Sequence, residues 1–121
     1  AKLSEELGPV VASLVVGAVW GLWHAPLILL GYNYPHHSDW LGVAVFTLSC
    51  SLMGVYFSWL AVGSGSVLPV ALAHGAFNAY AQVALFVVKV EDEIYGAPFG
   101  LASLPAYLLL ALVAAWAMGA A

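Results

Sequence analysis

Two histidines and one asparagine are the side chains of this sequence best suited to chemistry. His24 lies in one long apolar stretch, and His74 and Asn78 lie together in another. A polar side chain at membrane depth is costly in free energy, so it needs a hydrogen-bond partner or a function. An imidazole can take up or release a proton near neutral pH, and an amide N–H can stabilise a developing oxyanion. These three residues are therefore the candidate catalytic residues.

The spacing of these residues places them on helix faces. His74 and Asn78 are four residues apart and share one face of a helix. Trp20 and His24 have the same spacing in the first apolar stretch. Pro26 lacks an N–H and is expected to kink that helix beside the imidazole. We therefore expect the two helices to direct His24, His74 and Asn78 into one small polar volume.

A shared site requires the two imidazoles to lie at similar depths in the membrane. At a rise of about 1.5 Å per residue, His24 lies ~22 Å along from Pro9, whereas His74 lies ~10 Å from Val67. Straight parallel helices would leave the imidazoles at different depths, so a tilt, a kink or an earlier helix start must close the gap. A shared site requires the two imidazoles to lie within about 12 Å of each other.

The composition is typical of a membrane protein. Of the 121 residues, 64% are hydrophobic and 7% are charged, and the mean hydropathy is +1.02. An ordinary soluble domain carries about 25% charged residues. The net charge is −4 and arginine is absent from the sequence, which excludes nucleic acid as a partner. Cys50 is the only cysteine, and we interpret it as a buried apolar residue.

Four apolar stretches are predicted to cross a hydrocarbon core of about 30 Å as helices. Their hydrophobicity is continuous rather than alternating, which favours helices over a β-barrel. We predict an all-α, polytopic membrane helix bundle in one domain, residues 1–121, with spans over residues 9–30, 41–61, 67–88 and 104–121. Residues 31–40 and 89–100 are polar and turn-rich and are predicted to be loops. The lipid bilayer is thus the first expected partner.

The sequence around the candidate residues resembles a known family. The run GPVVASLVVGAVWGLWHAPL covers residues 8–27, and LPVALAHGAFNA covers residues 68–79. Together they resemble the CPBP family of intramembrane proteases, also called the Abi family, which includes type II CAAX prenyl endopeptidases and bacteriocin-processing proteins. That family carries three motifs: Glu-Glu-x-x-x-Arg, aromatic-x-x-x-His and His-x-x-x-Asn. Trp20 to His24 matches the second motif, and His74 to Asn78 matches the third.

The resemblance implies a membrane-embedded endopeptidase that hydrolyses a peptide bond at or within the membrane. It implies that His24 helps a glutamate to activate water, and that His74 and Asn78 stabilise the oxyanion of the tetrahedral intermediate. The implied substrate is a peptide or a prenylated protein. The implied location is a prokaryotic cell membrane, which the chain crosses several times.

The first family motif has only a partial counterpart. Glu5 and Glu6 form an acidic pair, but Val10 stands where the motif requires arginine. A continuous helix from Glu5 to His24 would separate the two residues by about 28 Å, close to the thickness of the bilayer core. We therefore expect the glutamate pair upstream of Ala1. On this interpretation the chain is the C-terminal part of the catalytic domain, and its partners include the preceding helices of that domain.

Two other functions stay open at this point. His24 and His74 could be axial ligands of a haem held between two helices. The histidines and Asn78 could instead line the polar path of a transporter. A divalent metal such as zinc is an optional cofactor of the protease, but two histidines and an asparagine fall short of the three protein ligands of a catalytic zinc site.

Overall fold

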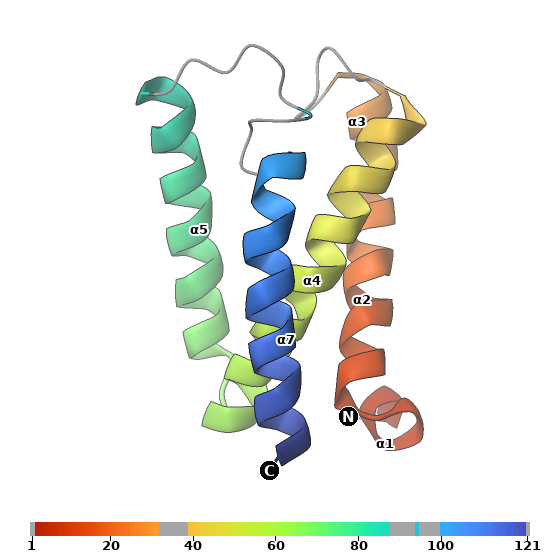
Figure 1. Cartoon of the computed structure of the whole chain (residues 1–121), viewed down its shortest axis with the longest axis vertical. Helices are drawn as coiled ribbons and strands as arrows, with labels where there is room; N and C mark the ends of the chain where they lie inside the picture. Colours follow the sequence, from red (N-terminus) through yellow and green to blue (C-terminus); the bar gives the residue numbers. More distant parts are fainter. Residues whose placement is uncertain (1, 32–38, 88–93, 95–99, 121) are drawn as a thin grey trace.

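The computed structural model describes residues 2–31, 39–87, 94 and 100–120. Within these ranges the regular structure consists of helices and contains no strand (Figure 1). The helices are α1 (Lys2–Leu7), α2 (Pro9–Trp23), α3 (Ala25–Leu29), α4 (Trp40–Ser64), α5 (Leu68–Val87), the short 3₁₀ helix η2 (Leu101–Ser103) and α7 (Leu104–Ala120). The predicted all-α fold is confirmed.

The four long helices alternate in direction. In Figure 1, α2 and α5 run from the lower end of the bundle to the upper end, and α4 and α7 run back. The short α1 and both ends of the chain lie at the lower end. Because α2 runs upward, its last residues, including those next to His24, lie in the upper half of the bundle.

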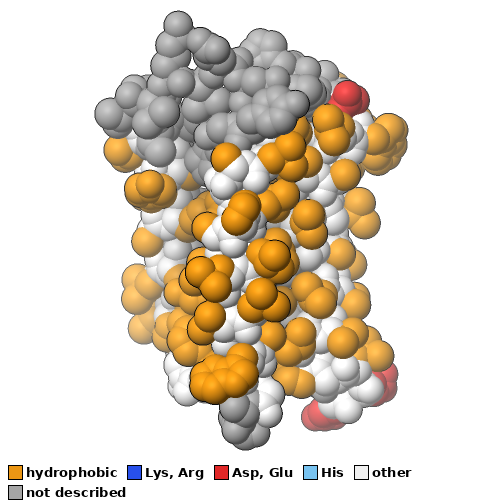
Figure 2. All heavy atoms as spheres, viewed as in Figure 1, with side chains coloured by type: hydrophobic (Ala, Val, Ile, Leu, Met, Phe, Trp, Pro, Cys, Tyr) orange, Lys and Arg blue, Asp and Glu red, His pale blue; other side chains and the backbone are white. Residues whose placement is uncertain are grey.

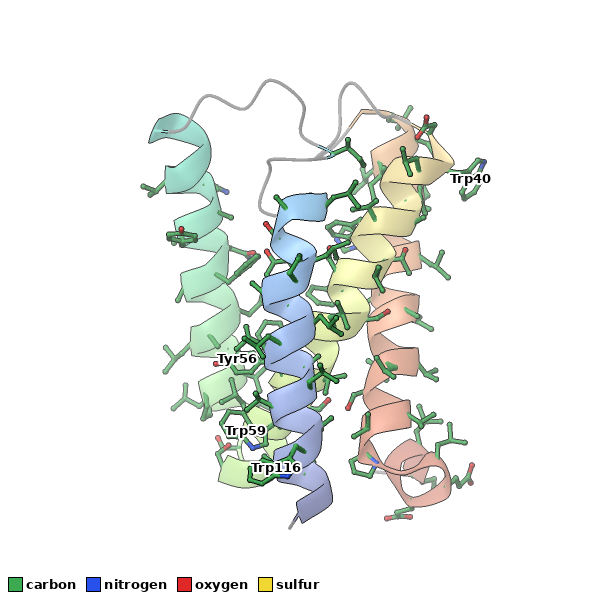
Figure 3. The ribbon with its side chains drawn as sticks, viewed as in Figure 1. Trp40, Tyr56, Trp59 and Trp116 are labelled. Atoms are coloured by element: carbon green, nitrogen blue, oxygen red, sulfur yellow. The ribbon has the colours of Figure 1, made fainter. Side chains whose placement is uncertain are left out.

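The exterior of the bundle fits a bilayer. Two helical segments, Trp40–Ser64 and Leu101–Gly119, are long and apolar enough to cross a membrane, and α2 is a shorter apolar helix. Figure 2 shows apolar side chains along the length of the bundle and acidic side chains near its ends. Trp40 is 68% exposed at one end, and Trp116 is 74% exposed near the other (Figure 3). Tryptophans favour the two membrane–water interfaces, so the protein is a membrane-embedded helix bundle.

The first predicted span is two helices rather than one. Helix α2 ends at Trp23 and α3 begins at Ala25, with His24 between them. Pro26, in the first turn of α3, has no N–H to donate to the carbonyl of Leu22. The helix is therefore interrupted beside Pro26, at the imidazole-bearing residue.

The helices in the other three predicted ranges begin and end within a few residues of the predicted bounds. Helix α4 starts one residue early because the Asp39 carboxylate caps it, accepting hydrogen bonds from the N–H groups of Leu41 and Gly42 at 3.0 and 3.3 Å. It ends at Gly65, whose φ of +64° is the left-handed conformation common after helices. The predicted loops 31–40 and 89–100 lie mostly outside the described residues.

Helices α2 and α4 touch backbone to backbone. A Cβ atom added to Gly17 would lie 2.6 Å from the carbonyl oxygen of Cys50, and one added to Gly21 would lie 2.6 Å from the Cα of Thr47. From the α4 side, a Cβ on Gly54 would lie 3.0 Å from the carbonyl oxygen of Ser13. Small residues allow this approach in membrane helices, where dispersion contacts drive association. The contact fixes the height of α2, and so of its histidine-bearing end, against α4.

Candidate functional site

The helix break at His24 orients its imidazole. The N–H of His24 donates to the carbonyl of Gly21 at 3.0 Å, which tightens the last turn of α2. The carbonyl of Trp20 can then accept a hydrogen bond from the imidazole, whose Nδ1 lies 2.8 Å from that oxygen. A carbonyl oxygen has no proton to give, so Nδ1 must be the donor. In the neutral ring this leaves Nε2 with a free lone pair, as a general base requires.

Trp20 brings the two histidines to one site. Its indole ring lies edge-on to both imidazoles, with centroid distances of 6.2 Å to His24 and 5.3 Å to His74. The imidazoles therefore cannot be further apart than the sum of these distances, which is inside the limit of about 12 Å for a shared site. Trp20 lies one turn before His24, at the level of His74, and so closes the expected gap in depth. Within the described residues, the two imidazoles have no direct hydrogen bond or ring contact.

Helix α4 supplies an aromatic contact to each histidine. The ring of Phe46 lies 4.9 Å from that of His24, and the ring of Phe57 lies 5.6 Å from that of His74. Phe57 also lies 6.4 Å from Trp20. The sequence motifs did not indicate Phe46 or Phe57 as contacts of the histidines. Their separation by eleven residues, three helical turns on one face, was the available signal.

Asn78 lies one turn beyond His74 on α5. His74 is half-buried, whereas Asn78 and the next residue of the same face, Gln82, are exposed. Among the described residues, no hydrogen-bond partner is found for the Asn78 amide. The structure thus brings His24 and His74 together through Trp20 and leaves the amide of Asn78 exposed, one turn beyond His74. The catalytic roles of the three residues stay predictions.

The acidic residues of α1 are remote from the histidines. Glu5 and Glu6 are exposed on α1, at the end of the bundle opposite the last turn of α2 (Figure 1). The described part of the chain contains no group of three or more His, Cys, Asp or Glu side chains that could hold a metal ion. A catalytic zinc needs three protein ligands. His24 and His74 alone therefore fall short of the ligand set of a catalytic zinc site.

The sequence comparisons identify one family. The family model described as type II CAAX prenyl endopeptidase Rce1-like matches residues 1–80. The match covers more than half of the chain and includes His24, His74 and Asn78. No curated protein and no solved structure matches the chain significantly. The resemblance to the CAAX-type intramembrane proteases is confirmed, and the chain belongs to the type II CAAX prenyl endopeptidase Rce1-like family.

Proposed function

We propose that this chain carries the histidine part of the active site of a membrane-embedded endopeptidase that cleaves a prenylated peptide at the membrane. The observation that carries the proposal is the contact of one indole ring, that of Trp20, with both imidazoles. The hydrogen bond from Nδ1 of His24 to the Trp20 carbonyl supports it, because it fixes the tautomer of a general base. The family match supports the choice of substrate.

The reaction begins when Nε2 of His24 takes a proton from a water molecule. By the resemblance to the family, a glutamate shares this task. The water oxygen attacks the carbonyl carbon of the scissile peptide bond, and N–H groups of His74 and Asn78 donate hydrogen bonds to the resulting oxyanion. The carbon–nitrogen bond then breaks, and the protonated His24 returns its proton to the leaving amine. The products are one new carboxylate and one new amine.

The arrangement does not favour a haem between the two histidines. A bis-histidine haem needs both imidazoles free to face the iron. Here the Trp20 ring lies against both imidazoles. A porphyrin would have to displace the indole ring, so no observation supports this alternative.

Proteolysis of a defined peptide tests the proposal. The full-length protein is reconstituted into phospholipid vesicles and incubated with a peptide that ends in a prenylated CAAX sequence, and its products are measured by mass spectrometry. We expect cleavage of this peptide and much slower cleavage of the same peptide without the prenyl group. Equal cleavage of both peptides would contradict prenyl recognition. Cleavage of neither would contradict the proposed function.

Replacing Asn78 with alanine is expected to lower kcat by about 10²-fold and to leave KM nearly unchanged, because loss of one oxyanion donor acts on the transition state. The measurement is a Michaelis–Menten series with the prenylated peptide. Gln82→Ala, one turn further along the same exposed face, is the matched control and should keep wild-type kinetics. Unchanged kcat in Asn78→Ala would remove Asn78 from the oxyanion site.

Phe57 is expected to hold the His74 ring in position. Phe57→Leu removes the ring that lies 5.6 Å from the imidazole. A shift of an ångström at a catalytic group can cost a large factor in rate, so we expect kcat to fall about tenfold while KM changes little. Phe57→Tyr keeps the aromatic ring and should restore kcat. Equal kcat for the leucine and tyrosine variants would show that the ring does not position His74.

A further inference from the structure

An apolar cavity lies beside the candidate site, between α4, α5 and α7. Its volume is about 310 Å³. Its wall includes Met53, Tyr56 and Phe57 from α4, Ala73 and Ala76 from α5, and Tyr107 from α7. Figure 3 labels Tyr56, whose side chain lies between the ribbons of α5 and α7. The volume is at the lower end of the range, about 300–1,000 Å³, in which proteins hold small ligands.

The lining of the cavity excludes water as its filling. Of the lining residues, Tyr56 and Tyr107 alone carry a polar side-chain atom. A buried water needs two to four polar partners, so apolar cavities of this kind stay dry. Protein interiors contain few voids larger than a water molecule, because the atoms around a void lose their dispersion contacts. An apolar molecule that reaches the cavity therefore binds without competition from water.

The cavity opens onto the membrane-facing surface. Ala76 and Leu110 line it and are themselves exposed, Leu110 by 45%. The neighbouring Leu72 and Leu109 are also exposed and apolar. These residues lie within the long helices of the bundle, where the surrounding medium is hydrocarbon. The rim of the cavity is therefore continuous with the surface that contacts lipid chains.

We propose that this cavity binds one acyl chain of a bilayer phospholipid, inserted between α5 and α7. The chain fills the void with dispersion contacts and leaves its headgroup at the membrane surface. Phe57 joins the cavity to the candidate site, because its ring lines the cavity and also contacts His74 and Trp20. The bound acyl chain thus supports the ring that lies against His74.

Photolabelling in a bilayer tests the acyl chain directly. The full-length protein is reconstituted with phosphatidylcholine that carries a diazirine on one acyl chain, irradiated, digested and mapped by mass spectrometry. In the wild type we expect adducts at Met53 and Tyr107 in the cavity and at Leu112 on the open face of α7. Absence of adducts at both cavity residues, with Leu112 labelled, would overturn the proposal.

A variant whose cavity is filled by a side chain is compared with the wild type in the same labelling experiment. Ala73→Phe places a ring in the cavity, and we expect the adducts at Met53 and Tyr107 to fall about tenfold, as for a tenfold loss of affinity. Labelling of Leu112 should not change. Ala71→Phe is the matched control, because Ala71 is exposed on the same helix and does not line the cavity. Undiminished cavity labelling in Ala73→Phe would overturn the proposal.

A second cavity variant and an isoprenoid competitor complete the photolabelling experiment. Ala76→Phe fills the cavity from its rim and replaces Ala73→Phe if that variant does not fold, with the same expected loss of cavity adducts. Farnesol, a free isoprenoid alcohol, is added to wild-type vesicles as a competitor. Cavity labelling that persists at equimolar farnesol supports an acyl chain as the occupant. Loss of labelling at that ratio would assign the cavity to an isoprenoid chain and overturn the proposal.

Discussion

Replacing His24 or His74 with alanine is expected to lower kcat/KM of the full-length protein about 10²- to 10⁴-fold, the usual contribution of a positioned acid–base group. His24 has one nitrogen held by the Trp20 carbonyl and the other free, so alanine removes the proposed base. His74 is the only residue of α5 whose ring contacts Trp20 in the described structure. The measurement is the rate of cleavage of the prenylated peptide in vesicles.

Two conservative variants separate chemistry from packing. His74→Phe keeps a ring against Trp20 and Phe57 but carries no N–H. His24→Asn keeps an amide N–H for the Trp20 carbonyl but carries no base. We expect both variants to fold as the wild type does, by circular dichroism, and to be as inactive as the alanine variants. A fully active His74→Phe would show that His74 acts by packing alone.

The sequence predicted the helices and the two motif pairs within them because both follow from local rules. Continuous apolar runs of membrane-spanning length have few folds open to them other than a helix. Pro26 predicts a kink because the missing N–H acts within one turn, and the break falls at His24. The motif pairs Trp20–His24 and His74–Asn78 depend on four-residue spacing, which any α-helix turns into a shared face.

The contacts between helices could not be predicted in the same way. Periodicity shows which residues share a face but not which helix covers that face. Phe46 and Phe57 contact the two histidines only because α4 lies against both α2 and α5. For the same reason, helix rise alone could not predict that His24 and His74 lie close together. The indole ring of Trp20 contacts both imidazoles and spans the difference in their depth.

The backbone contact at Gly17 is expected to make the stability of the bundle sensitive to substitution of this residue. A Cβ at this position would lie 2.6 Å from the Cys50 oxygen and 2.6 Å from the Cα of Ser51, and neither backbone atom can move without the helix. Gly17→Ala is therefore expected to cost about 1–3 kcal/mol through overpacking. Gly17→Leu adds three further carbons at the same contact and is expected to separate α2 from α4 and abolish the folded bundle.

The measurement is unfolding of the full-length protein in detergent, followed by circular dichroism. Gly75→Ala and Gly75→Leu are the matched controls, because a Cβ on Gly75 meets nothing within 4 Å. We expect them to unfold like the wild type. Cleavage should fall with stability in the Gly17 series, since Trp20 moves with α2 away from Phe57 on α4. A Gly17→Leu protein with wild-type stability would contradict the close contact of α2 and α4, and with it the geometry that brings Trp20 to both histidines.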